Sequence, residues 1–165
     1  MRISHAVRLL VLCGLISALL SAVPAMAAMQ AYMTIKGVKQ GHIRSDSTSE
    51  NIRLVSVTHD AATGMASGKR MHTPVTVTKL IDAASPKLFA AFSSHETLSE
   101  VAIVFSKSGS QGQMVVVEKI VMNNATIVSI RKAGANEMIT FDYQTIEVTW
   151  NDGGKTATDD WEAPK

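Results

Sequence analysis

The chain has 165 residues, of which 46% are apolar, and it carries a formal net charge of +2 at pH 7. This length is typical of one domain and this apolar share is sufficient for a hydrophobic core, so a mostly disordered chain is excluded. Basic residues form no stripe and aromatic residues do not cluster, so nothing in the composition supports binding to nucleic acid.

Residues 1–27 have the parts of a cleavable signal peptide in the expected order. Arg2 and Arg8 flank the start of the apolar run LLVLCGLISALLSAV at residues 9–23. That run is too short to span a bilayer comfortably, so it favours a signal peptide over a transmembrane helix.

The end of this leader carries the residues that signal peptidase requires. Ala25 and Ala27 are small residues at the third and first positions before a cut. We expect cleavage after Ala27, with cleavage after Ala28 as the second choice. Cleavage removes Cys13, the only cysteine, so no disulfide is expected. Residues 28–165 are then formally neutral, form a single domain and carry no stable membrane anchor.

Strand patterns follow at short intervals in the mature chain. The first is AYMTIKG at residues 31–37. In the second, NIRLVSVTH at residues 51–59, Ile52 and Leu54 share one face while Val55 and Val57 share the other. Because side chains alternate strictly along a strand, this change of face predicts a bulge or burial on both sides.

A strand and a helix are predicted within PVTVTKLIDAASPKLFAAF, which begins at Pro74. Valine alternates with threonine in the first half, as in a strand. After Ser85, a predicted N-cap, and Pro86, a favourable first helical residue, the apolar residues fall three and four apart. A helix of about residues 85–95 is too short to be stable alone. We expect its apolar face to pack against the sheet or over a barrel mouth.

Three strand patterns and three turns come next. EVAIVFSK, QMVVVEKIVM and ATIVSIRK read as strands, and KSGSQGQ at residues 107–113 predicts a hairpin between the first two. Asn123 and Asn124 predict a tight hairpin turn before the third, because asparagine tolerates a left-handed backbone. Residues 134–136 predict the turn before a last long strand.

That last strand, MITFDYQTIEVTW at residues 138–150, also changes face. Phe141 and Tyr143 fall on odd positions, whereas Ile146 falls on an even one. Bulges of this kind bend strands around a closing sheet. The fold class is therefore predicted as mainly β: an antiparallel β-barrel of two coiled sheets with one short flanking α-helix.

Signals for catalysis or metal binding are sparse. The mature histidines, at 42, 59, 72 and 95, lack the local spacing of a metal site, and no G-x-S-x-G motif occurs. Gly68 and Lys69 loosely resemble a phosphate loop, but Arg70 follows where Ser or Thr is required. Asp142 and Glu147 are interpreted as a solvated face. We expect no catalytic residue, no metal and no cofactor.

The residues resemble a known family. HTPVTVTKLIDAASPKLFAAF, followed by EVAIVFSKS and YQTIEVTW, is similar to the haemolysin-coregulated protein (Hcp) family, the tube subunits of bacterial type VI secretion systems. The resemblance extends from about residue 31 to residue 161, and its most specific part is KLIDAASPKLFAAF. YMTIKGVKQG resembles the opening strand of the family.

The resemblance implies a small barrel whose copies form homohexameric rings that stack into a hollow tube. A contractile sheath expels such a tube together with effectors and a spike protein, and these are the implied partners besides the chain itself. A building block of this kind needs no nucleophile, metal or cofactor.

The resemblance and the apolar pattern also suggest contact residues. The loop implied to project toward the adjacent ring is residues 61–70, with Gly64, Met65, Ser67, Gly68 and Lys69 as the possible ring-stacking residues. QMVVVEKIVM is apolar on both faces, so Val115, Val117 and Val121 are a possible subunit interface. The alternative is that both faces are buried inside one subunit.

The leader leaves two alternatives open, because tube proteins assemble in the cytoplasm. In the first, translation starts at Met29 and the protein is cytoplasmic before secretion. In the second, the leader is a true signal peptide and the protein is secreted or periplasmic. In the second case an exported monomeric binding or adaptor protein is the alternative to a tube subunit. A small secreted hydrolase is a third hypothesis, without catalytic signals to support it.

Overall fold

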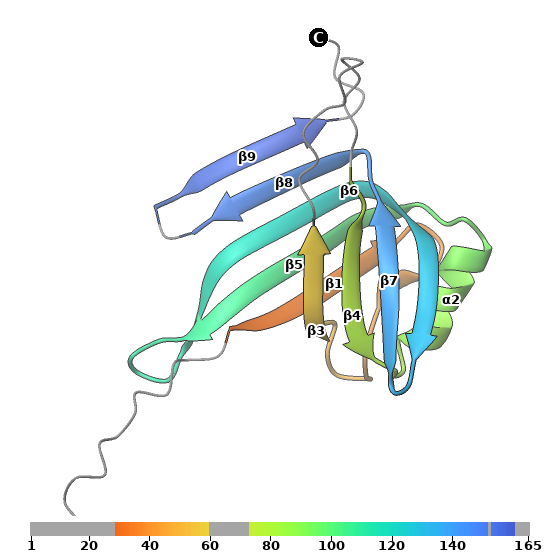
Figure 1. Ribbon diagram of the computed structural model, residues 1–165, viewed down its shortest axis with the longest axis horizontal. Coiled ribbons are helices and arrows are strands. Elements are labelled where there is room, and N and C mark those ends of the chain that lie inside the picture. Colours follow the sequence, from red (N-terminus) through yellow and green to blue (C-terminus); the bar gives the residue numbers. More distant parts are fainter. Residues whose placement is uncertain (1–28, 60–72, 152, 161–165) are drawn as a thin grey trace, which may run out of the picture.

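The structure is a computed structural model that describes residues 29–59, 73–151 and 153–160. Its elements are shown in Figure 1, and their bounds are β1 (Gln30–Gly37), β2 (Gly41–Ile43), β3 (Ile52–His59), β4 (Val75–Leu80), α2 (Ser85–Ser93), β5 (Leu98–Ser108), β6 (Met114–Ala133), β7 (Asn136–Asp142), β8 (Thr145–Trp150) and β9 (Lys155–Asp160). The predicted leader, residues 1–27, lies outside the described residues.

The strands form one antiparallel sheet that closes on itself. β1 pairs with β3, β3 with β4, β4 with β7, β7 with β6, β6 with β5, and β5 with β1. β2 adds to β1, β8 to β6, and β9 to β8, outside the closed ring of strands. The predicted mainly β barrel with one short helix is confirmed, with a single coiled sheet in place of two.

β6 is one continuous strand of 20 residues, so the hairpin turn predicted at Asn123 and Asn124 is wrong. Asn124 does adopt the left-handed backbone, with a φ of 49°. It bends the strand instead of reversing it. Before the bend β6 pairs with β8, and after the bend it pairs with β7.

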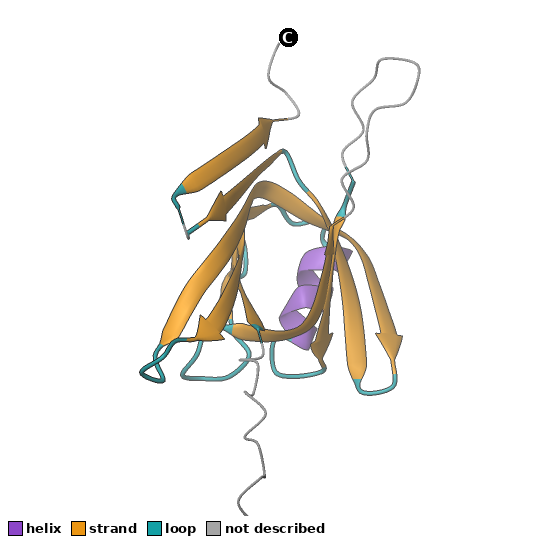
Figure 2. Ribbon diagram, turned by 60° about the vertical axis from the view of Figure 1, so that its left-hand side comes forward, coloured by secondary structure: helices purple, strands orange, loops and turns teal. Residues whose placement is uncertain are grey.

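The predicted last long strand is also wrong, because the chain breaks between β7 and β8 at Tyr143 and Gln144. The break is the physical origin of the change of face seen in the sequence. β7 joins β4 and closes the barrel, whereas β8 leaves it and carries β9 outward, as Figure 2 shows.

Other sequence predictions for the strands are confirmed. The register of β3 shifts between Leu54 and Ser56, which is the expected bulge, and leaves Val55 60% exposed. Ser108 pairs with Met114 and Ala133 pairs with Asn136, as two hairpins require. The core fills the barrel with side chains from its strands and the helix.

The helix closes one mouth of the barrel. Figure 2 looks into the barrel and shows α2 across its far opening. Leu88 and Ala91 are buried in the core, and Phe92 packs against it, as predicted. The helix ends at Ser93, earlier than predicted, and its N-cap is Ala84, not Ser85. Ser85 is the first residue of the helix, and its hydroxyl bonds within the polar cluster described below instead of capping the helix.

The bend at Asn124 generates a prediction. The change Asn124→Val should lower the free energy of unfolding by about 1–2 kcal/mol, because a left-handed backbone is strained for a β-branched residue. The control Asn124→Gly keeps that backbone without strain. It loses an exposed 2.6 Å hydrogen bond to the Gln144 side chain and about 0.5–1 kcal/mol through the entropy of the unfolded chain, so it should cost less than Asn124→Val. Urea denaturation distinguishes them, and equal stability of the two variants would contradict the prediction.

Candidate subunit interface

The described part of the chain offers little chemistry of the catalytic kind. Within it, no three His, Cys, Asp or Glu side chains gather closely enough to hold a metal ion. No helix among the same residues has both the length and the apolar character needed to cross a bilayer. The surface features of interest are apolar ones, and a buried polar cluster shapes one of them.

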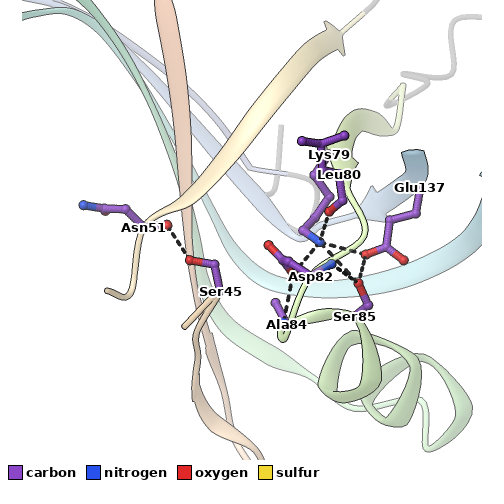
Figure 3. Close-up of polar contacts among 8 residues, drawn as sticks. All are labelled: Ser45, Asn51, Lys79, Leu80, Asp82, Ala84, Ser85 and Glu137. Atoms are coloured by element: carbon purple, nitrogen blue, oxygen red, sulfur yellow. Dashed lines mark hydrogen bonds and ion pairs between the residues drawn. The ribbon is translucent and has the colours of Figure 1, made fainter. Parts of the chain in front are cut away.

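A buried ion pair lies where β4 ends and β7 begins, as Figure 3 shows. Lys79 is 0% exposed and Glu137 is 2% exposed. The Lys79 Nζ donates to Glu137 Oε1 at 2.9 Å, to Asp82 Oδ1 at 2.7 Å and to the Leu80 carbonyl at 2.6 Å. The Ser85 hydroxyl donates to the same Glu137 oxygen at 2.6 Å. The charges are therefore matched inside the fold, as burial requires.

This cluster ties the β4 end to the helix start. The Asp82 backbone N–H donates to the Ser85 hydroxyl at 3.1 Å, and the Ala84 N–H donates to Asp82 Oδ1 at 2.9 Å. Strand alternation turns Leu80 outward when Lys79 points inward. Leu80 is 57% exposed and Ile81 is 46% exposed. The cluster thus holds two large apolar side chains at the surface.

These two side chains border a groove of about 900 Å³. We name it the β1–β4 groove; its lining residues are Met29, Gln30, Ser45, Asp46, Asn51, Arg53, Leu54, Val55, Leu80, Ile81, Asp82 and Asn136. Besides Leu80 and Ile81, its exposed large apolar side chains are Met29 at 59% and Val55 at 60%. A groove with this apolar lining and a polar rim resembles the core and rim of protein interfaces.

A second exposed apolar surface lies at the start of β6 and the end of β8. We name it the hairpin patch, consisting of Met114, Val115, Val116 and Trp150, which are 48%, 38%, 37% and 42% exposed. Because side chains alternate along β6, Val115 points to the opposite side of the sheet from Met114 and Val116, so the patch covers both sides of these strand ends. The Asn151 N–H donates to the Val117 carbonyl at 2.9 Å, which holds these two strand ends together. A hollow of about 270 Å³ lies between Lys107, Asn151 and the valines at 115–117.

The predicted interface valines do not share one environment. Val115 is exposed in the hairpin patch, Val117 is 5% exposed within its own subunit, and Val121 is half-buried. The register shift between Phe105 and Ser106, opposite this part of β6, breaks the alternation that placed the three together. The expected contact between copies through Val115 remains a prediction, whereas Val117 is covered in the single subunit.

Other predicted residues lie elsewhere. Ala25, Ala27 and Ala28, and the loop residues Gly64, Met65, Ser67, Gly68 and Lys69, lie outside the described residues. Ser85 and Pro86 stand at the start of α2. The sequence analysis missed Lys79 and Glu137, although Lys79 follows Val75 and Val77 on the inward face of an alternating strand. That position was the available signal.

A tyrosine links the strands that flank residues 60–72. The Tyr143 hydroxyl donates to the Thr73 carbonyl at 3.1 Å and lies 3.2 Å from His59 Nε2. Since the hydroxyl has one hydrogen, the His59 Nε2–H is the donor in the second bond. Burial, and secondarily the charges of Asp159 and Asp142, raise the pKa of Tyr143.

The chain matches one protein family and is similar to an exported bacterial protein. Residues 32–150 match the family described as "Type VI secretion system effector, Hcp". The chain is 30% identical to the "Major exported protein" of Pseudomonas aeruginosa, over 83% of this chain and 98% of that protein.

Two solved structures show the same fold. The secreted protein Hcp3 of Pseudomonas aeruginosa is 30% identical, with a TM-score of 0.70 over 82% of this chain and 100% of that one. A variant of the Hcp1 protein of E. coli EAEC 042 is 26% identical, with a TM-score of 0.71 over 81% of this chain and 99% of that one.

The buried ion pair generates a stability prediction. The change Lys79→Met should lower the free energy of unfolding by about 3–5 kcal/mol, because it leaves the Glu137 carboxylate buried without a cation. The double change Lys79→Met with Glu137→Leu should cost less than the single change. Lys87→Met, on the exposed face of α2, is the control. Denaturant unfolding measures all three, and a double variant no more stable than the single one would contradict the argument.

The raised pKa of Tyr143 generates a pH prediction. A raised pKa in the folded state favours the neutral phenol, so the stability it contributes is present below the ordinary pKa of 10.0 and is lost as pH rises above it. Between pH 9 and pH 11 the parent protein should therefore lose stability more steeply than Tyr143→Phe. Melting temperatures across that range provide the measurement, and parallel pH profiles would refute the prediction.

Proposed function

Because this chain belongs to the Hcp family, it is a type VI secretion tube protein, and we propose that its copies assemble into homohexameric rings that stack into a hollow tube. The observation that carries the proposal is the apolar surface left uncovered on the single subunit. The β1–β4 groove and the hairpin patch each expose four large apolar side chains. Permanent assemblies bury such surfaces in interfaces that commonly exceed about 2,000 Å².

The kind of symmetry follows from the two surfaces being different. A surface that meets its own copy forms a closed dimer, whereas two unlike surfaces that meet each other add copies head to tail. Such a series closes into a ring when the rotation between neighbours allows it. The groove and the patch consist of different residues from different strands, which supports a ring.

Secretion is a property that this chain shares with its relatives, and the route is a further proposal. We infer that residues 1–27 are a signal peptide cut after Ala27, or after Ala28. The product is then exported to the periplasm or beyond. If translation begins at Met29 instead, the protein leaves the cytoplasm through the secretion system itself.

The remaining assignments follow from the role of a subunit that forms the wall of the tube. We propose that the protein has no catalytic activity and uses no cofactor, and that its partners are its own copies, the sheath, the spike protein and effectors. The loop with Gly64, Met65, Ser67, Gly68 and Lys69 is the proposed contact between stacked rings.

The alternative function is an exported, monomeric binding or adaptor protein on the same barrel. The observation that favours it is the order of charged, apolar and small residues in the leader. It differs from the first proposal in one measurable property, the number of subunits in the purified protein.

Light scattering combined with size exclusion provides the test. The purified protein should elute at six times the mass of one subunit and show rings by electron microscopy, because the groove and the patch bind copies of the chain. A mass of one subunit at high concentration would reject the ring and favour the adaptor. N-terminal sequencing of the same sample shows processing after Ala27 if Ala28 comes first. Because cleavage after Ala28 and translation from Met29 both leave residue 29 first, the variant Met29→Leu separates these two: it removes only the internal start, so the mature protein is lost if translation begins there and is kept if the leader is cut.

A further inference from the structure

β8 and β9 lie outside the closed barrel. One of their faces continues the inner face of β6, but the barrel does not cover it. Strand pairing places Ile120 beside Val148 and Ala157, and Glu118 beside Trp150 and Lys155. Exposure increases along β8 on this face, from 6% at Ile146 to 42% at Trp150. The reason is that β7, not β8, closes the barrel, so the end of β8 lies beyond the core.

This uncovered face carries two charges beside its aromatic side chain. Glu118 is half-buried and Lys155 is exposed. Neither forms an ion pair with a residue in the described ranges. Trp150 therefore stands between an acid and a base that have no charged partner in this part of their own subunit.

The β1–β4 groove has the reciprocal arrangement. Arg53 is exposed in its lining and likewise makes no ion pair among the residues that the structure describes. Asp46 is on the same rim, and its Oδ1 accepts hydrogen bonds from the Thr48 and Ser49 backbone N–H groups at 2.7 Å. These bonds lower the pKa of Asp46, so it is a carboxylate at neutral pH.

We propose that the side of the hairpin patch that carries Trp150 packs into the β1–β4 groove of the next subunit, with Trp150 among Val55, Leu80 and Ile81. In this arrangement Glu118 faces Arg53 of the adjacent copy, and Lys155 faces its Asp46. The inference rests on the proposed ring and names the surfaces and charges that build it.

Three properties of the surfaces favour a second copy as the occupant. Apart from Asp82, which is paired with Lys79, the groove supplies one cation and one anion, Arg53 and Asp46, and Glu118 and Lys155 supply one of each beside Trp150. A tryptophan in an apolar pocket surrounded by polar groups is the usual form of an interface anchor. The two surfaces are different, so each copy offers a free groove and a free patch after the first contact, as a closing ring requires.

A charge exchange tests the contact. Arg53→Glu places two acids opposite each other at every interface, and Glu118→Arg places two bases there. Each change should raise the protein concentration needed for half assembly about tenfold or more, because like charges at a contact are strongly unfavourable. The double variant carries the pair in reversed order and should assemble as the parent does. Lys87→Glu, with the same change of charge on α2, is the matched control.

Mixing the two single variants sharpens the test. In an alternating ring, every contact joins either the original pair or the reversed pair, so a 1:1 mixture should assemble although neither variant does so alone. An even number of subunits permits this alternation. Trp150→Ala should weaken assembly independently of charge. The control is Phe89→Ala, which removes an exposed aromatic side chain from α2.

The outcomes separate this inference from the proposed function. A parent protein that forms rings while Arg53→Glu and Glu118→Arg assemble equally well overturns the inference and leaves the ring intact. Loss of assembly in the single variants without rescue in the double variant or the mixture also overturns it. A parent protein that remains a single subunit overturns both. Thermal melting of each variant confirms that Arg53 and Glu118, which lie outside the core cluster, were changed without unfolding the chain.

Discussion

The geometry of β6 is the constraint on which the rest of the structure depends. One strand pairs along one edge with β5 and offers the other edge first to β8 and then to β7. The bend at Asn124 separates these two segments. Because every buried backbone group needs a hydrogen-bond partner, the segment after the bend draws β7 across to close the barrel. The segment before it holds a two-stranded extension outside the barrel.

The closed barrel and the extension divide the apolar residues into two classes. Side chains that face inward on the barrel strands are almost fully buried, and the helix covers one mouth. Side chains at the end of β8 and the start of β6 are also apolar, but no barrel surrounds them. They are exposed because of the way the strands are connected, not because of their residue types. The subunit therefore has an apolar surface that a monomeric protein of this size does not need.

The Lys79 and Glu137 pair performs a comparable task at the β4 end. A well-packed apolar pair is often as stable as a buried ion pair, so stability alone is a weak reason for its presence. The pair directs the chain: it ties the strand end, the turn and the first residue of α2 to one another, and it leaves Leu80 and Ile81 beside the groove. The buried charges therefore fix the positions of these segments more than they raise the free energy of unfolding.

The sequence by itself determined most of the strand content, the change of face near Val55, two hairpins, and the short helix with its buried face, because all of these depend on local periodicity and local turn chemistry. The family followed from the resemblance of its motifs. The sequence did not reveal that β6 runs through Asn124 or that β7 and β8 are separate. A left-handed asparagine permits both a reversal and a bend, and only the partners on either side choose between them.

The candidate interface divides in the same way. The valines at residues 115–117 indicated that this part of β6 is apolar on both faces. Only the register with β5 decided that Val115 is exposed and Val117 is buried. The groove joins side chains from β1, β3 and the β4 end, which are separated by many residues in the chain. Their proximity is decided by long-range pairing, and long-range pairing depends on the closure of the whole sheet.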